Sequence, residues 1–254
     1  ISYVQVIADE GGADSNSLCY SGEYVSIGTT SQGYVVLVWY DSVNGNLMYS
    51  YNTTPAAGTT GRNKTNWSDA VKIFSGAGEY YQLAVDAADG IHIAFYDGTT
   101  GDLKYAYLSS YNDSSAATCT VDSYAIVGQN ITIDVAYDGT KYVPHIGYYA
   151  LSSAKPKYAY LAGTSVSDGV DSDDAYTGVW DCSLIPTTSK MIQDSVNVGV
   201  WKDSSGAVTE SAKGTSFAGT YYGKCYGNGT KNAVLGYAIK TSSTSGYIET
   251  AQMK

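Results

Sequence analysis

Residues 78–108 read GEYYQLAVDAADGIHIAFYDGTTGDLKYAYL, and this stretch decides the fold. Apolar and polar residues alternate over Tyr80–Val85, Ile91–Tyr96 and Leu103–Leu108, which is the period of β-strands. Between the last two segments lies DGTTGD, residues 97–102, which is rich in residue types that tolerate tight turns. The pattern predicts three antiparallel strands joined by short connections.

The same pattern recurs along the chain. Residues 22–52 (GEYVSIGTTSQGYVVLVWYDSVNGNLMYSYN) and residues 128–161 (GQNITIDVAYDGTKYVPHIGYYALSSAKPKYAYL) align with it. Weaker copies occupy residues 189–214 and 219–254, where the tyrosine pairs that close the first three copies are lost. Repeats of about 50 residues built from short strands are typical of β-propeller blades.

We therefore predict an all-β single domain, a β-propeller of five blades with four antiparallel strands each. Outer fourth strands are expected at Ala70–Phe74, Thr118–Tyr124 and Val179–Leu184. No residues remain after the last copy, so a strand within residues 1–10 is expected to complete it and close the ring, because an open array leaves bare sheet edges. The repeat units are expected at residues 11–66, 67–116, 117–175, 176–214 and 215–254.

The motifs HIAFYD (residues 92–97) and GDLKYA (residues 101–106) carry a resemblance to a known family. The chain resembles the Tyr-Asp-rich propeller-type repeats of bacterial secreted and cell-surface proteins, clearly in the first two units, partly in the third and weakly in the last two. The resemblance implies a surface-exposed propeller. It assigns an activity to no residue, because the motif is structural.

Composition limits the partners. The 254 residues carry a net charge of −10, and 26 of them are tyrosine. An acidic chain lacks the clustered lysines and arginines that phosphate binding needs, so we expect no nucleic-acid partner. No apolar run approaches the ~20 residues of a membrane helix, so we expect no membrane insertion.

Several features favour an extracellular or cell-surface location. The four cysteines fit no metal or redox spacing. Cys19–Cys225 and Cys119–Cys182 are the favoured disulfides among three pairings, because the first pair flanks first strands of neighbouring units and the second pair lies on outer strands of adjacent units. The chain begins at Ile1 without methionine, as a processed secreted chain would. Glycosylation sequons occur at Asn52, Asn63, Asn66, Asn112, Asn130 and Asn228.

Histidines and carboxylates that repeat are interpreted as structural. His92 and His145 share a repeat position that Val36, Val198 and Leu235 occupy elsewhere, which indicates packing. Asp41, Asp97 and Asp203 also recur, each at the start of a turn, which indicates turn caps. Four less regular carboxylates remain, and no pair of them is singled out as glycosidase acid and nucleophile: Glu79, Asp86, Asp134 and Asp138.

Residues outside the repeat are the better candidates for binding. Among the aromatic residues these are Trp67, Tyr111, Trp180, Tyr221 and Tyr222, each with structural packing as its alternative. An acidic stretch supplies oxygen ligands suited to Ca²⁺, with a solvated loop as its alternative: Asp168, Asp171, Asp173 and Asp174. No other cofactor is expected.

Two function classes remain. The first is a non-enzymatic extracellular protein that acts through its surface, as an adhesin, a lectin-like module or a filament subunit, with glycans or other protein subunits as partners. Strand exchange by residues 1–10 into a neighbouring copy would give a homopolymer. The alternative is a carbohydrate-active enzyme similar to glycoside-hydrolase propellers.

Overall fold

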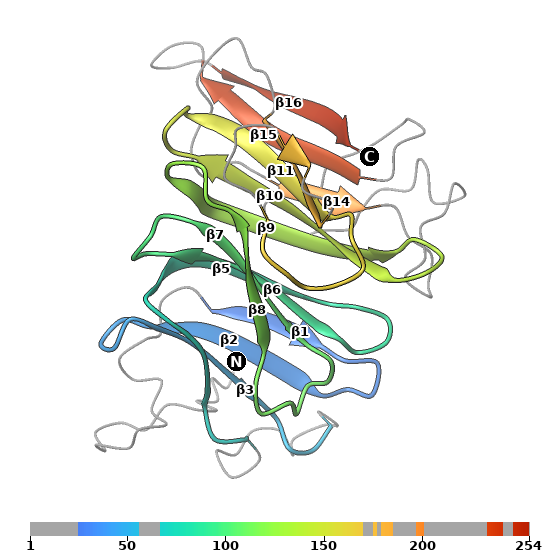
Figure 1. Cartoon of the computed structure of the whole chain (residues 1–254). Helices are drawn as coiled ribbons and strands as arrows, with labels where there is room; N and C mark the ends of the chain where they lie inside the picture. Colours follow the sequence, from blue (N-terminus) through green and yellow to red (C-terminus); the bar gives the residue numbers. More distant parts are fainter. Residues whose placement is uncertain are drawn as a thin grey trace.

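A computed structural model of the chain describes residues 25–55, 67–169, 175–176, 179–184, 197–200, 233–240 and 246–253. These residues form strands and turns (Figure 1). No helix that could span a membrane occurs among them.

Four antiparallel sheets follow one another along the chain and stack from the blue end to the red end of Figure 1. The first contains β1 (Ser26–Thr29), β2 (Val35–Asp41), β3 (Asn46–Tyr51) and β4 (Val71–Ser75). The second contains β5 (Ala77–Val85), β6 (Ile91–Asp97), β7 (Leu103–Leu108) and β8 (Ala117–Asp122). The third contains β9 (Val127–Tyr137), β10 (Tyr142–Ala150), β11 (Lys155–Leu161), β13 (Trp180–Leu184) and, beyond β13, the short β12 (Ala175–Tyr176). The described part of the fourth contains β14 (Asn197–Val200), β15 (Ala233–Lys240) and β16 (Gly246–Met253).

The strands predicted from the repeat are confirmed in the first three sheets. The expected Leu103–Leu108 is β7 residue for residue, and Ile91–Tyr96 is β6 but for one residue. The expected outer strand Ala70–Phe74 corresponds to β4, which pairs with β3 and so belongs to the first sheet. Each outer strand therefore completes the sheet that precedes it in the chain.

The fourth sheet differs from the prediction. The predicted unit boundaries separate β14, in residues 176–214, from β15, in residues 215–254, yet Val198 of β14 pairs with Leu235 of β15 in one sheet. The two segments carry the same alternating pattern, and pattern alone does not separate adjacent strands of one sheet from equivalent strands of two sheets. The count of five blades and ring closure by residues 1–10 stay predictions, because residues 1–24 and 201–232 lie outside the described part of the chain.

The core lies between consecutive sheets, with the leading strands in contact: β1 with β5, β5 with β9, and β9 with β14. One apolar cluster joins the first and second sheets and includes Tyr49 and Phe95. Another joins the second and third sheets and includes Tyr105, Tyr148 and Trp180. Full burial of an aliphatic or phenylalanine side chain in these clusters stabilises the fold by about 1.5–3 kcal/mol, so face-to-face packing of the sheets stabilises the stack.

The turns that follow β2 and β6 have the predicted caps. Asp41 accepts hydrogen bonds from the backbone of Val43 and Asn44, and Asp97 does the same from two residues of its own turn. Both turns end on a glycine with left-handed φ, Gly45 at 66° and Gly101 at 85°, a conformation that side chains disfavour.

Candidate functional site

An open groove lies between the first and second sheets, where β2 and β6 turn into β3 and β7. Its volume is about 470 Å³. Three tyrosines and one glutamate line it together with small residues: Tyr40, Tyr80, Tyr96, Glu79, Thr99, Gly45, Gly76, Ala77, Gly78 and Gly98. A concave site with aromatic walls and few polar groups is the usual form of a small-molecule site.

A β-bulge in β5 shapes one wall of the groove. Between two regular pairs of β5 and β6, residues 78–80 lie opposite Tyr96 alone. Bulges interrupt the ladder of hydrogen bonds and redirect side chains. The rings of Tyr80 and Tyr96 meet edge to face, with centroids 6.1 Å apart and planes at 71°, and so form a corner. A Cβ on Gly78 would lie 2.5 Å from Cδ1 of Tyr96, so this ring rests directly on the glycine backbone.

Small residues keep the groove open, as a comparison with the next pair of sheets shows. The amide of Gly98 donates to the carbonyl of Gly76, and between the second and third sheets the matching bond runs from Leu151 to Ile126. Ile126 and Leu151 are 43% and 41% exposed and occupy the places of the two glycines. Among the described residues, the repeat therefore builds an open groove between the first and second sheets and an apolar surface at the equivalent place between the second and third.

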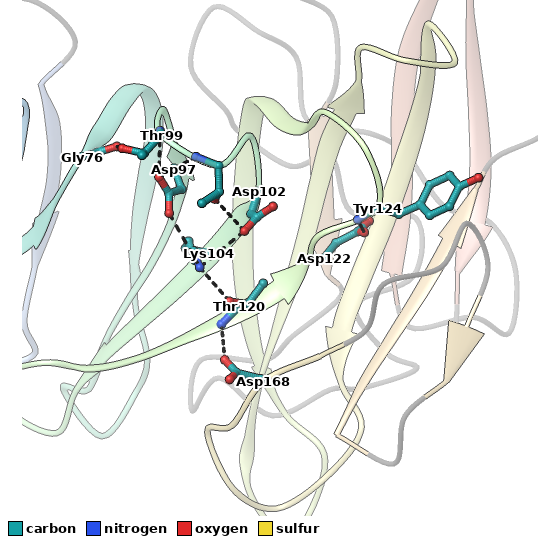
Figure 2. A network of polar contacts seen from close by, with 10 residues as sticks. Gly76, Asp97, Thr99, Asp102, Lys104, Thr120, Asp122, Tyr124 and Asp168 are labelled. Atoms are coloured by element: carbon teal, nitrogen blue, oxygen red, sulfur yellow. Dashed lines mark hydrogen bonds and ion pairs between the residues drawn. The ribbon is translucent and has the colours of Figure 1, made fainter.

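A polar network fixes the turn at the rim of the groove (Figure 2). Asp97 accepts the backbone amide of Thr99 at 2.9 Å. Nζ of Lys104 lies 3.7 Å from Asp97 and 3.6 Å from Asp102, and it donates to Thr120 at 2.7 Å. The ammonium group of Lys104 thus lies close to the carboxylates of both Asp97 and Asp102. These contacts, together with the hydrogen bond to Thr120, fix the turn at the rim of the groove.

Glu79 is the one lining carboxylate and it is exposed. Within the described residues its side chain has no hydrogen-bond or ion-pair partner in the protein. A free carboxylate beside aromatic faces can accept hydrogen bonds from hydroxyl or ammonium groups while the rings pack on an apolar face. The groove is therefore suited to a ligand with both kinds of surface.

Comparison with solved structures gives the fold. A triple arginine-to-alanine variant of AofleA from Arthrobotrys oligospora aligns with 92% of this chain and 54% of its own, at 8% identity and a TM-score of 0.52. The chain is similar to β-propeller proteins. At this identity the likeness concerns the fold alone, and this propeller-like chain spans about half the length of that protein.

Two further structures align over most of the chain with lower scores. Unsubstituted AofleA aligns at 6% identity and a TM-score of 0.47, over 97% of this chain and 64% of its own. A GH62 hydrolase in complex with xylotriose aligns at 11% identity and a TM-score of 0.45, over 96% of this chain and 68% of its own. No family model matches the sequence. No curated protein matches it either.

The aromatic candidates from the sequence that lie among the described residues are not part of the groove lining. Trp180 is 0% exposed in the core between the second and third sheets, so it offers no face to a ligand. Trp67 is half-buried and forms an isolated bridge with Asn52. Tyr221 and Tyr222 lie outside the described residues.

Tyr111 belongs to an aromatic cluster at the other end of β2 from the groove. Its ring stacks on Tyr34 at 3.9 Å and 13°, and Tyr51 meets it edge-on at 5.3 Å. Interaction with the side chain of Tyr34, with burial as a second cause, raises the pKa of Tyr111 to about 12. Tyr111 therefore lies in an aromatic stack that is separate from the groove.

The histidines are buried, as the packing interpretation requires. Nδ1 of His92 lies 2.6 Å from the hydroxyl of Tyr105, and Nε2 lies 2.9 Å from Asp86. Burial holds the pKa of Tyr105 well above its ordinary value, so this hydroxyl donates to Nδ1 and Nε2–H donates to the carboxylate. His145 repeats the contact with Tyr158 at 2.5 Å. These contacts fix neighbouring strands and leave no ring nitrogen of His92 for a metal.

The structure describes some of the residues predicted to bind Ca²⁺ or to carry glycans, and others lie outside its described part. Asp168 accepts the amide of Thr120, while Asp171, Asp173 and Asp174 lie outside the described residues. No cluster of potential metal ligands occurs in the part of the chain that the structure describes. Asn52 is 1% exposed and its Oδ1 accepts the amide of Val35, so the folded chain has no room for a glycan there.

Of the other five sequons, two lie among the described residues and three lie outside them. Asn112 is exposed, whereas Asn130 lies half-buried in the bulge of β9 with left-handed φ. Asn63, Asn66 and Asn228 lie outside the described residues.

The cysteines differ from the expected pairing. Cys119 and Cys182 are both buried in the same core cluster, but each thiol is free. Each is placed by a different neighbour, since Sγ of Cys182 points to the carbonyl of Val121 at 3.6 Å and Cys119 contacts Trp180. Cys19 and Cys225 lie outside the described residues.

We expect Cys119 and Cys182 to resist alkylation in the native protein. Burial raises the pKa of both thiols to about 12, and the thiolate is the reactive form. Iodoacetamide at mildly alkaline pH should label both only after unfolding, as measured by mass spectrometry of their peptides. Rapid labelling without denaturant, or a peptide cross-linked between the two, would contradict the buried free thiols.

Sequence reasoning named Glu79 among the less regular carboxylates, but it missed the tyrosines of the groove because it favoured aromatic residues outside the repeat. Tyr40 and Tyr96 both precede the turn aspartate of their unit, so they belong to the repeat and were not among the binding candidates. The available signal was the exchange of small for large residues at matching turn positions, Gly98 against Leu151.

Proposed function

We propose that this chain is a lectin-like protein that binds a glycan in the groove between its first and second sheets. The observation that supports this proposal is the lining of the groove, where Tyr40, Tyr80 and Tyr96 lie beside the unpartnered carboxylate of Glu79. Aromatic rings bury the apolar face of a sugar, and a carboxylate accepts from its hydroxyls. The likeness to propeller structures supports the scaffold only.

An extracellular or cell-surface location is part of the same proposal. It is supported by the acidic composition, which opposes non-specific association, and by an exposed sequon at Asn112. A glycan ligand would be available to the protein at that location.

Binding is favoured over hydrolysis by the carboxylates of the groove. Glycoside hydrolysis needs two carboxyl groups about 5–10 Å apart across the scissile bond. Among the described lining residues, Glu79 is the one carboxylate. A panel of glycosidase substrates, run with the binding assay, distinguishes turnover from binding.

The test of this proposal is to close the groove by one substitution. Gly98→Leu places there the residue that Leu151 supplies in the next pair of sheets, and the backbone of Gly98 is not left-handed. A glycan array should identify a ligand for the unsubstituted chain, and calorimetry should show at least a tenfold loss of affinity in Gly98→Leu, or about 1.4 kcal/mol.

The matched control makes the reverse exchange. Leu151→Gly alters the equivalent turn of the third sheet and leaves the groove untouched, so affinity should be retained. Retained binding in Gly98→Leu, or equal losses in the two variants, would place the ligand elsewhere. A silent glycan array would contradict glycan binding itself.

A further inference from the structure

We infer that the groove selects glycans whose sugar rings carry a positively charged amino group. The inference rests on the proposed function and names the ligand class of the same site. Three features of the groove lead to it: its charge, the arrangement of its rings and the absence of a cation from its described lining.

The charge of the groove is negative. Glu79 lines it without a protein partner, and Asp41 and Asp97 cap the two turns at its rim. The nearby cation, Lys104, is already held between Asp97 and Asp102 and bonds Thr120 (Figure 2). A cationic ligand therefore finds an unpaired carboxylate, while an anionic sugar meets repulsion with no compensating group in the described lining.

The rings provide a second attraction for a cation. Tyr80 and Tyr96 stand at 71° with centroids 6.1 Å apart, and Tyr40 lines the same groove. An ammonium over a tyrosine face is attracted by the ring quadrupole, by about 0.5–1 kcal/mol at exposed sites and more when desolvated. Sugar C–H groups pack on the same faces, so one amino sugar can use the rings and Glu79 together.

The bulge of β9 in the third sheet can be compared with the bulge of β5 that shapes the groove. β9 carries Gln129 and Asn130 where β5 carries Glu79 and Tyr80, so both the carboxylate and the aromatic corner are absent there. The third sheet therefore lacks these cation-binding features, whereas the first copy of the repeat carries the same pair, Glu23 and Tyr24, outside the described residues. Glu79→Gln converts the one charged position into the residue that the third sheet uses.

The experiment compares two probes that share the sugar ring and differ in charge and in one acetyl group per ring. Short oligosaccharides of glucosamine and of N-acetylglucosamine share the ring and the linkage, and acetylation removes the positive charge. Calorimetry at about pH 6, where glutamate is ionised, should show at least tenfold tighter binding of the glucosamine oligomer. The preference should weaken as salt is raised.

Two variants separate the groove from the overall charge. Glu79→Gln should remove the preference for the glucosamine oligomer. Asp138→Asn removes one charge from the hairpin between β9 and β10 and keeps an oxygen to accept the amides of Thr140 and Lys141, so the preference should persist. Equal losses in both variants would show non-specific attraction to an acidic protein and overturn the inference.

The remaining outcomes distinguish this inference from the proposed function. Equal binding of both oligomers, or binding of neutral glycans only, would overturn the cation preference and leave glycan binding in place. Failure of every glycan to bind in the array and in calorimetry would remove both.

Discussion

Replacing Lys157 by methionine is expected to lower the free energy of unfolding by about 3–5 kcal/mol, because it strands a buried carboxylate. Lys157 on β11 and Asp122 at the end of β8 are both 0% exposed, and Nζ lies 2.6 Å from Oδ2. The same carboxylate accepts the hydroxyl of Tyr148 at 2.6 Å and the amide of Tyr124 at 3.0 Å. The pair joins the second sheet to the third, so its loss weakens their interface.

The size of this effect comes from the charge left behind. Asp122 without its cation must be protonated or solvated inside the core, whereas removing both charges avoids that penalty. Lys157→Met combined with Asp122→Asn should therefore recover a large part of the stability, because asparagine keeps an oxygen for Tyr124. Urea unfolding followed by circular dichroism measures both variants.

Lys155→Met is the matched control for this comparison. Lys155 lies two residues away on the same strand, is half-exposed and has no ion pair among the described residues. Its replacement should change stability by less than about 1 kcal/mol. Equal losses in Lys155→Met and Lys157→Met, or no recovery in the double variant, would contradict a buried ion pair.

The strands were predictable because their signal is local. Ile91–Asp97 and Leu103–Leu108 alternate at the strand period and are separated by a turn whose aspartate and glycine each have a physical role. The same signal is weak after residue 189, where the tyrosine pairs are lost. There the sequence indicated strands but not which sheet they join, and β14 pairs with β15.

Burial within the repeat was not predictable from the pattern. Lys104 and Lys157 hold the same repeat position, yet the side chain of Lys104 is 16% exposed and that of Lys157 is 0% exposed. The difference depends on the neighbouring sheet, which alignment of the repeats does not describe. The presence of lysine at this position in two copies of the repeat therefore did not indicate that Lys157 pairs with Asp122.

The groove was also not predictable from the repeat pattern, because it depends on how two neighbouring sheets fit together. It depends on a bulge that sets residues 78–80 opposite Tyr96, and strict alternation hides such an insertion. It also depends on Gly98 being small where Leu151 is large. Tyr96 belongs to the repeat and so was not among the binding candidates, although a repeated residue can line a site wherever its neighbours leave space.

Replacing Trp180 by alanine is expected to cost about 3–5 kcal/mol of stability, the usual range for a large aromatic residue in a core. Trp180 is 0% exposed, and its ring meets Tyr105 edge-on with centroids 5.2 Å apart. Its Nε1 donates to the carbonyl of Ser167 at 3.1 Å. Truncation removes this bond and leaves a cavity between the second and third sheets, which relaxes only in part.

Two controls test whether Trp180 acts through packing. Trp67→Ala, at a half-buried position, should cost markedly less in urea unfolding. Trp180→Phe keeps most of the ring volume and should recover much of the loss. Because the groove lies between the first and second sheets, folded Trp180→Phe should bind its glycan with unchanged affinity. A loss of binding in Trp180→Phe at unchanged stability would instead make Trp180 part of a ligand site.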